Sequence, residues 1–312
     1  MDLTLTQCAA ARPRSVRVGI PTRTDRGRLH ARIATAVRAA LQAAPWPPGL
    51  RAVVHEILND SGRILGGRLT PWASLPVYCA LAMGGTISAA LPASVACELY
   101  AAALDVIDDI QDNDPSPVIT LFGMPVALNG ALALLALADT ALYPARPRGA
   151  DTPRHARARS ALWAGLMTAT SGQHLDIVST GSTSLSLSIS ERLAMARGKS
   201  GALVEACARA GASLSTDDDA QIARCGLLGR GLGLCGQIEN DIHDAANPGK
   251  KGNRPTQTLA RHAVDVPLAY ALMYAEWARV RTAADDVIAH ASDATIARAA
   301  LAPLFAREDG IR

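Results

Sequence analysis

The sequence predicts an all-α protein, and two of its features carry that prediction. Hydrophobic residues make up 49% of the 312-residue chain but aromatic residues only 4%. The core must therefore be filled by Ala, Leu, Val and Ile, of which Ala and Leu are strong helix formers. No stretch of useful length alternates apolar and polar residues with the period of a strand, and no repeat recurs at fixed spacing.

Proline and glycine residues mark where the helices of the first half should begin and end. Proline lacks the backbone N–H that a helix interior needs, and glycine is common just beyond a helix end. On this basis residues 1–25 are expected to be irregular and residues 26–312 to form one helical domain. The helices expected in order run over residues 25–44 up to a Pro-rich segment at 44–48, over residues 50–61 up to a turn at 66–67, from about residue 71 to the glycines at 84–85, and from a start near Pro92 to Asp112.

The same rules divide the second half of the chain. Pro115 and Pro117 break the helix that ends at Asp112, and a loop rich in Pro and Arg is expected at 144–153. The expected helices run over residues 125–143, 154–179, 190–213 and 217–245, followed by a loop rich in Gly, Asn, Pro and Lys at 247–257 and by two C-terminal helices.

Charge and cysteine usage exclude two classes of protein. The formal net charge is +3 and the basic residues are spread along the chain, whereas nucleic-acid-binding proteins concentrate Lys and Arg in a patch. No nucleic-acid partner is therefore expected. The six cysteines form no CxxC pair and several lie in apolar helical stretches. This favours free thiols in a reducing cytoplasm over a disulfide scaffold.

The segment 121–143 is apolar enough to be mistaken for a transmembrane helix. It contains Pro125, Asn129 and Asp139, and it lacks a strong basic flank on its N-terminal side. A buried core helix of a large bundle is the better interpretation, so no membrane span is expected.

Four carboxylates fall on one face of the helix that ends at Asp112. They have the spacing i, i+3, i+4 and i+7 and are Asp105, Asp108, Asp109 and Asp112. Like charges at i,i+4 cost an isolated helix roughly 0.2–0.5 kcal/mol per pair. A solvated acidic face is the simplest explanation of such a stripe, but the flanking residues are apolar. The stripe is therefore expected at the mouth of a buried cavity, where a hard cation with oxygen ligands would compensate its charge.

A second stripe of oxygen donors with the same spacing lies about 130 residues later, also in an apolar helix. It consists of Gln237, Asn240, Asp241 and Asp244. Two such stripes on separate helices point to a shared site in which Mg²⁺, which prefers few carboxylates together with waters and phosphate, holds a diphosphate. The metal would draw off diphosphate as a leaving group and leave an allylic carbocation in an apolar pocket.

The order and spacing of these motifs resemble the trans-isoprenyl diphosphate synthases, the polyprenyl synthetase family, over residues 66–271. The segment 108–112 looks like the family's first Asp-rich motif, whose end carboxylates bind Mg²⁺. The segment 237–244 looks like the second motif, with Asn240 where Asp is usual. The resemblance implies a single-domain isoprenoid synthase-type helical bundle around a central cavity, three Mg²⁺ ions bound with the diphosphate, and a homodimer. The implied metal ligands are Asp108, Asp112, Asn240, Asp241 and Asp244.

Two further segments resemble the family's substrate contacts. The segment 198–203 resembles the Lys-Thr segment, whose Lys contacts the allylic diphosphate, and the segment 172–176 resembles the Gly-Gln-x-x-Asp segment of a helix that faces the cavity. The implied catalytic residues are Asp108, Asp109, Asp112, Lys199 and Asp241. The residues expected to bind substrate are Arg68, Tyr100, Leu104, Gln173, Lys199, Gln237, Lys250 and Lys251.

Departures from the family pattern concern the second substrate. The family has a Gly-Gly-Lys-Arg-x-Arg-Pro segment whose cations hold isopentenyl diphosphate. Residues 66–71 are one residue shorter and keep only Arg68. The Arg-Arg-Gly segment that usually follows the first motif is replaced by the run 113–117. A second diphosphate carries about three negative charges and needs several fixed cations, so this half of the site is expected to be eroded.

These departures favour Mg²⁺-dependent ionisation of an allylic diphosphate without isopentenyl diphosphate. The prenyl group would then pass to an unknown acceptor, or the cation would cyclise or lose a proton. Ordinary condensation with isopentenyl diphosphate is the first alternative, since other arginines can rebuild the missing anchor. A non-catalytic partner subunit is the second, although such a subunit would be expected to lose its Asp motifs.

The length of the prenyl chain is expected to be C15 or C20. Leu104 and Ala103, four and five residues before Asp108, are not aromatic, so the pocket should reach past them to Tyr100. Tyr100 lies eight residues before Asp108, about 12 Å down the helix axis.

Overall fold

The computed structural model describes residues 23–60, 62–114, 116–143, 151–181, 188–246 and 266–305. Within them it contains helices and no strand, which confirms the predicted all-α class. In chain order the helices are α1 (Arg23–Ala43), α2 (Pro48–Asn59), α3 (Pro71–Ala82), α4 (Ile87–Asp112), α5 (Pro117–Phe122), α6 (Met124–Ala141), α7 (Asp151–Gly181), α8 (Ile189–Ala196), the π-helical turn η1 (Arg197–Gly201), α9 (Ala202–Ser213), α10 (Asp219–Ala246), α11 (Val266–Ala289) and α12 (Ala294–Phe305).

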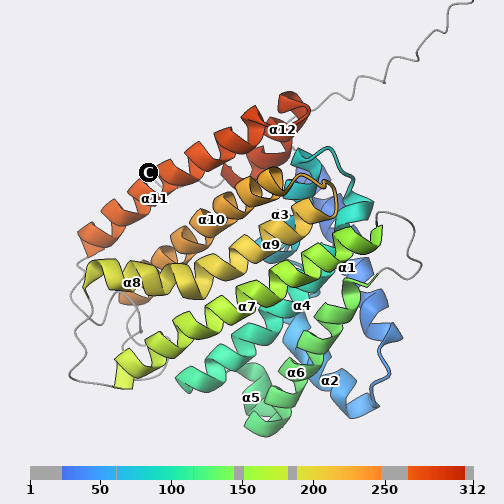
Figure 1. Cartoon of the computed structure of the whole chain (residues 1–312). Coiled ribbons are helices and arrows are strands. Elements are labelled where there is room, and N and C mark those ends of the chain that lie inside the picture. Colours follow the sequence, from blue (N-terminus) through green and yellow to red (C-terminus); the bar gives the residue numbers. More distant parts are fainter. Residues whose placement is uncertain are drawn as a thin grey trace, which may run out of the picture.

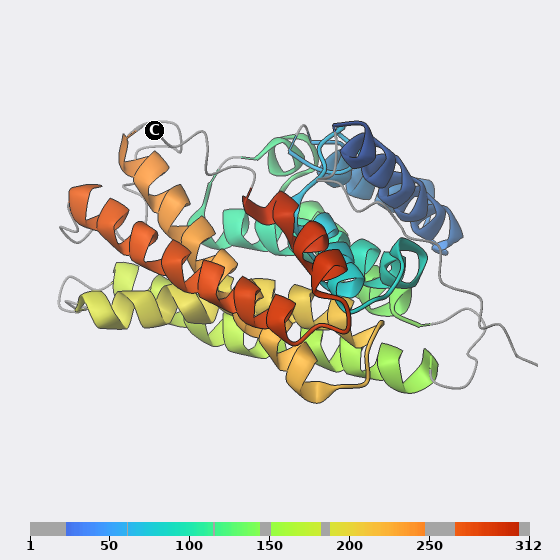
Figure 2. The same ribbon diagram turned by 90° about the horizontal axis from the view of Figure 1, so that it is seen from above.

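The helices form one bundle in which α7, α9, α10 and α11 lie side by side (Figures 1 and 2). The C-terminal ends of α4, α7 and α10 lie toward the same end of this bundle, at the left of Figure 1, as does the junction of α8 and α9. Most of the segment expected to be irregular, residues 1–22, lies outside the described residues, as do Lys250 and Lys251.

Helix α3 lies at the centre of the bundle, packed against α4, α9 and α12. It is apolar around its whole circumference and nearly every residue in it is buried, as expected for a helix surrounded by others. Thr70 caps its N-terminus by accepting a hydrogen bond from the backbone N–H of Ala73 at 3.0 Å. The Thr70 hydroxyl also donates to Glu98, a fully buried carboxylate on α4. The cap therefore ties the start of α3 to α4.

Helix α4 begins earlier than the sequence pattern predicts. Thr86 caps it, since its side chain accepts from the backbone N–H of Ala89 at 3.2 Å, and the helix starts at Ile87. Pro92 lies inside the helix rather than at its start, where it removes one backbone hydrogen bond. The predicted start near Pro92 was wrong because the capping threonine outweighs the proline as a start signal. The predicted end at Asp112 is confirmed.

Helix α6 is not the buried core helix that the sequence predicts. Both α4 and α6 are long and apolar enough to cross a membrane, but 67% of the apolar window in α4 is buried within the protein against only 28% in α6. Leu132 of α6 is 54% exposed and Met167 of the neighbouring helix α7 is 73% exposed. An apolar face of α6 and α7 is thus uncovered in the single chain.

Five cysteines lie in the described residues, and all are buried free thiols, as predicted. Four of them lie on neighbouring helices, one each on α3, α4, α9 and α10. A hydrogen bond from the Cys79 thiol to Cys225, together with burial, raises the pKa of Cys79, and burial and a hydrogen bond to Cys207 raise the pKa of Cys97. Cys79 and Cys97 therefore stay protonated and act as small packing groups.

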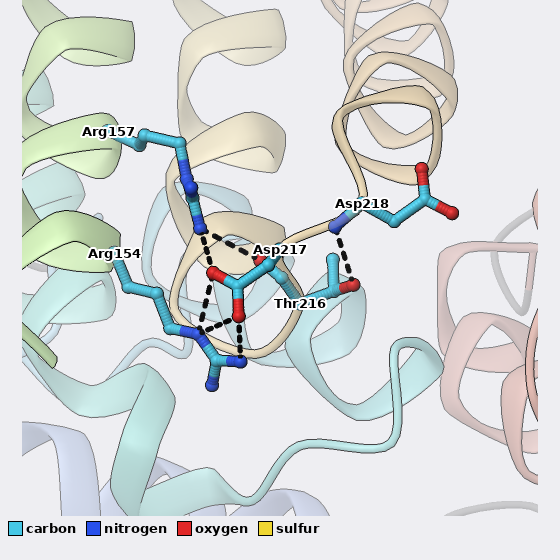
Figure 3. Close-up of polar contacts among 5 residues, drawn as sticks. All are labelled: Arg154, Arg157, Thr216, Asp217 and Asp218. Atoms are coloured by element: carbon cyan, nitrogen blue, oxygen red, sulfur yellow. Dashed lines mark hydrogen bonds and ion pairs between the residues drawn. The ribbon is translucent and has the colours of Figure 1, made fainter. Parts of the chain in front are cut away.

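The loop between α9 and α10 is fixed to α7 by an ion cluster (Figure 3). Arg154 donates to both carboxylate oxygens of Asp217, Arg157 donates to the same carboxylate, and Arg157 also reaches the carbonyl of Thr216 at 3.4 Å. Hydrogen bonds from Arg154 and Arg157 lower the pKa of Asp217 from 3.8 to about 2. This ion cluster joins the N-terminal turns of α7 to the residues just before the N-terminus of α10.

The cluster predicts a pH-dependent part of the stability. Because the folded pKa of Asp217 lies below its ordinary value, the stabilisation is complete above about pH 4 and is lost as the pH falls toward 2. Asp217→Asn is expected to lower the urea midpoint at pH 6, and the difference from the unmodified chain should shrink between pH 4 and pH 3. A constant difference across this range would show that the carboxylate charge contributes nothing.

Candidate functional site

The first Asp motif occupies the last two turns of α4. Asn113, in the left-handed conformation with φ 56°, ends the helix directly after Asp112. A helix C-terminus carries a partial negative charge, so carboxylates are electrostatically disfavoured there. Burial, with the neighbouring Asp108 carboxylate, raises the pKa of Asp112 to about 6. The motif therefore needs cations close by.

One cation is already present, because the ammonium of Lys199 lies between two helices' carboxylates. Its Nζ is 3.1 Å from Oδ1 of Asp108 on α4 and 3.1 Å from Oδ2 of Asp176 on α7. Burial alone would lower the pKa of Lys199, but the carboxylates of Asp108 and Asp176 outweigh it and raise the pKa. The side chain is therefore a charged ammonium that joins α4, α7 and η1.

The position of Lys199 depends on a π-helical turn that the sequence did not reveal. The predicted helix over residues 190–213 is divided into α8 and α9 by η1. Single π-turns inside α-helices occur frequently at functional sites. The extra residue of a π-turn leaves the helical period of the segment on either side unchanged. The sequence pattern therefore predicted helix throughout and did not locate the turn.

Gly172 of α7 allows α7 to approach η1 closely. A Cβ at this position would lie 2.4 Å from the backbone nitrogen of Lys199 and 2.8 Å from the carbonyl carbon of Gly198. The next residue, Gln173, donates to Oδ1 of Asp108 at 2.8 Å and to Oε1 of Gln111 at 3.0 Å. The segment 172–176 thus contacts both the first Asp motif and Lys199.

The second Asp motif is connected to the same π-turn. The hydroxyl of Ser200, the residue after Lys199, donates to Oε1 of Gln237 on α10. The amide nitrogen of Gln237 donates to Oδ1 of the buried carboxylate of Asp241 at 3.1 Å. Asn240 is exposed, and the side chain of Asp244 lies outside the described residues. Lys199 and Ser200 therefore link η1 to the first and the second motif respectively.

Three other residues predicted to bind substrate lie on α4 or in the loop before α3. Arg68 is exposed in the loop before α3, and Leu104 is partly buried on α4. Tyr100 is buried between α4, α6 and α7, where its hydroxyl donates to the carbonyl of Leu162 at 3.1 Å and its ring lines a small hollow with Leu135 and Trp163.

Two buried charged residues, Arg63 and Glu98, were not singled out from the sequence. Arg63 is buried and donates to Asp105 and to the carbonyl of Ala101 at 3.4 Å, so Asp105 is drawn toward the α2–α3 loop. Glu98 accepts from the backbone N–H of Ile64 at 3.1 Å. The signal that could have revealed Glu98 is its place as a lone carboxylate within an apolar helical run, since a buried charge needs partners.

The donor set of the site suits Mg²⁺. Asp108 and Asp112 offer carboxylate oxygens one turn apart, and Asp241 offers another from α10. Oδ1 of Asp176 is buried and has no hydrogen-bond partner among the described residues. No three His, Cys, Asp or Glu side chains of the described residues converge closely enough to hold an ion by themselves. Mg²⁺ is commonly held by one or two carboxylates together with waters and substrate phosphate, which is the arrangement that these residues allow.

The close approach at Gly172 yields a prediction with a matched control. Gly172→Ala should cost roughly 1–3 kcal/mol of stability, as overpacking does, and should move η1 away from α4 and α7. At Gly236 of α10 an added Cβ meets no atom of the described residues within 4 Å, so Gly236→Ala should be neutral or stabilise by up to about 1 kcal/mol. Urea denaturation of both variants measures the difference, and equal effects would contradict the packing at Gly172.

Comparison with known proteins gives a family match over most of the chain. The sequence model of the polyprenyl synthetases matches residues 50–300. A geranylgeranyl diphosphate synthase from Mycobacterium tuberculosis is 31% identical over 206 residues, which are 64% of this chain and 57% of that protein. The match thus spans little more than half the length of that relative.

Solved structures share the fold at low sequence identity. A geranyltransferase from Legionella pneumophila superposes with a TM-score of 0.71 at 16% identity, covering 92% of this chain and 97% of its own. A geranyltransferase from Helicobacter pylori, complexed with magnesium and isoprenyl diphosphate, gives a TM-score of 0.68 at 16% identity, covering 90% of this chain and 97% of its own. These likenesses confirm the predicted type of helical bundle.

Proposed function

The chain belongs to the polyprenyl synthetase family, and on that premise we propose that it is a trans-isoprenyl diphosphate synthase. It condenses an allylic diphosphate of C15 or C20 with isopentenyl diphosphate and releases diphosphate. The observation that carries the proposal is the linkage of both Asp motifs through η1, by Lys199 on one side and Ser200 on the other. The geranylgeranyl diphosphate synthase among its relatives supports this ordinary condensation over transfer to an unknown acceptor or cyclisation.

The proposed roles rest on the positions of the described residues and, for Asp244, Lys250 and Lys251, on the sequence motifs alone. Asp108 and Asp112 hold metal from α4, and Asp241, with Asn240 and Asp244, holds it from α10. Lys199 binds the allylic diphosphate, Gln173 orients Asp108, and Asp109 remains a catalytic residue of the motif. Three Mg²⁺ ions are proposed, and held by these residues they would supply positive charge to the diphosphate leaving group. Arg68 contributes to the site of the second diphosphate, and Lys250 and Lys251 are proposed to close over the first.

Ionisation without isopentenyl diphosphate stays the second candidate, because the cations near the second site are few. Thr70 is committed to the α3 cap and to Glu98, and Arg63 is committed to Asp105. Arg68 alone is exposed in this loop among its described basic residues. A non-catalytic partner subunit is disfavoured, since both Asp motifs are retained.

Diphosphate release by the purified chain separates these candidates. With Mg²⁺ and farnesyl diphosphate, release should depend strictly on added isopentenyl diphosphate. Release that proceeds equally without isopentenyl diphosphate would favour the second candidate, and no release under either condition would contradict both enzymatic candidates.

Tyr100 is proposed to form the floor of the prenyl pocket. Tyr100→Ala should shift products toward longer chains, at a stability cost of roughly 3–5 kcal/mol for removing a buried aromatic ring. Tyr100→Phe, which removes only the hydroxyl bonded to the carbonyl of Leu162, should leave the product length unchanged. Product analysis of the two variants tests this, and an unchanged product length in Tyr100→Ala would remove the residue from the pocket.

We further propose that residues 26–312 act as one domain and that two copies form a dimer through the exposed apolar face of α5, α6 and α7. Exposed clusters of large apolar side chains commonly mark protein–protein interaction sites. The face includes Leu121, Met124, Val126, Leu128, Leu132, Trp163 and Met167. Sedimentation equilibrium is expected to give the mass of two chains. The buried free thiols agree with a proposed cytoplasmic location.

A further inference from the structure

Lys199 forms an ion pair with Asp108, a carboxylate to which the proposed function assigns metal binding. Its ammonium is 3.1 Å from Oδ1 of Asp108, and Gln173 donates to the same oxygen at 2.8 Å. Asp108 is 40% exposed at the end of α4, whereas Lys199 is 17% exposed. A divalent cation at this oxygen would repel the ammonium, so metal binding to Asp108 is disfavoured while Lys199 is paired there.

Asp176 keeps the ammonium in this place. Its carboxylate is 1% exposed and lies 3.1 Å from Nζ of Lys199. Taking a carboxylate out of water is costly unless a cation compensates it, and Lys199 is the cation that the described residues supply to Asp176. The Lys199 side chain is therefore tethered at Asp176 and can exchange only its other partner, Asp108.

We propose that Asp176 is a positioning residue that holds Lys199 as a latch on Asp108, so that the first Asp motif is masked until a diphosphate is present. A diphosphate draws the ammonium off Asp108 while Asp176 retains it, and Asp108 is then free to bind metal. The proposal rests on the proposed metal and diphosphate site.

Thermodynamic linkage gives the latch a measurable consequence. If diphosphate binding unmasks Asp108, the metal and the diphosphate must each strengthen the binding of the other by the same factor. Removing the latch should strengthen binding of the metal in the absence of any diphosphate. Couplings of this kind typically amount to roughly 5- to 150-fold in affinity.

The double variant Lys199→Gln/Asp176→Asn tests the latch. It removes one positive and one negative charge, so the net charge of the site is unchanged, and it leaves no buried charge without a partner. We expect it to bind Mn²⁺ alone, measured by the EPR signal of the free ion, roughly 5- to 150-fold more tightly than the unmodified chain. Unchanged or weaker binding would overturn the proposal, since Asp176 would then be a ligand or a spectator.

Two further variants keep the test specific. Arg63→Gln/Asp105→Asn removes another ion pair of α4, one that includes neither Asp108 nor Lys199, without changing the net charge, so its Mn²⁺ affinity should stay unchanged. Lys199→Arg keeps the cation and should keep the weak binding. A gain of affinity in either would contradict the latch.

The outcomes separate the latch from the proposed function. If the unmodified chain forms prenyl products but the double variant gains no Mn²⁺ affinity, the latch is wrong and the function stands. If the double variant gains affinity but the unmodified chain forms no product, the latch stands and the function is wrong. The Tm shift caused by Mn²⁺ gives a second readout, because a tighter ligand stabilises the folded state more.

Discussion

Asp112→Asn is expected to abolish most activity while making the chain more stable. As a metal ligand, Asp112 should contribute to kcat/KM by about 10²–10³-fold, the range found when one charge-stabilising group is removed from an active site. Burial and the Asp108 carboxylate raise its pKa to about 6, so above pH 6 its charge disfavours the folded state. Removing that charge should stabilise the protein by roughly 1 kcal/mol, after allowance for solvent screening.

Asp105→Asn is the matched control, because it changes the same chemical group on the same helix. Its carboxylate pairs with the buried Arg63 rather than with Lys199, so its loss should lower stability and leave kcat/KM within a few-fold. Steady-state kinetics and urea denaturation of both variants at pH 7.5 measure the crossed pattern. Equal losses of activity in the two variants would show that the stripe acts as one unspecific acidic face.

Lys199→Met is expected to be among the most destabilising single changes in the site. Removing one partner of a buried ion pair costs roughly 3–5 kcal/mol, since the other charge is left without compensation. Here the carboxylate of Asp176, 1% exposed, would lose its 3.1 Å contact. The variant should also lose binding of the allylic diphosphate.

A double-mutant cycle with Asp176→Asn checks the origin of this loss. The amide needs no counterion, so Lys199→Met/Asp176→Asn should recover most of the lost stability but none of the lost activity. The free energies of unfolding from urea titrations give the coupling between the two positions. Additive losses in the double variant would mean that Asp176 and Lys199 do not depend on each other.

The sequence predicted the all-α class and most helix positions because proline, glycine and composition act locally. It misplaced the start of α4, where the cap at Thr86 lies six residues before the predicted start at Pro92. It also joined α8 to α9 across η1. This π-turn packs closely against Gly172 of α7, a contact between segments far apart in the chain that local patterns do not reveal.

The candidate site could likewise be predicted from the sequence only in part. The two Asp motifs were recognisable from spacing, since each lies within a few turns of one helix, and Lys199 was recognisable from the resemblance of residues 198–203 to a segment of the family. The ion pairs that Lys199 forms with Asp108 and Asp176, and the bond from Ser200 to Gln237, join residues at least 23 positions apart. The exposed face of α6 was misjudged because composition does not reveal which apolar helix lacks a neighbour within the chain.

Product analysis tests the central claim most directly. The purified chain is incubated with Mg²⁺, farnesyl diphosphate and ¹³C-labelled isopentenyl diphosphate, and the products are identified by mass. We predict a prenyl diphosphate extended by five carbons that carries the label, and no product when isopentenyl diphosphate is omitted. An unlabelled hydrocarbon or alcohol formed equally with and without isopentenyl diphosphate would contradict the assignment as a chain-elongating synthase.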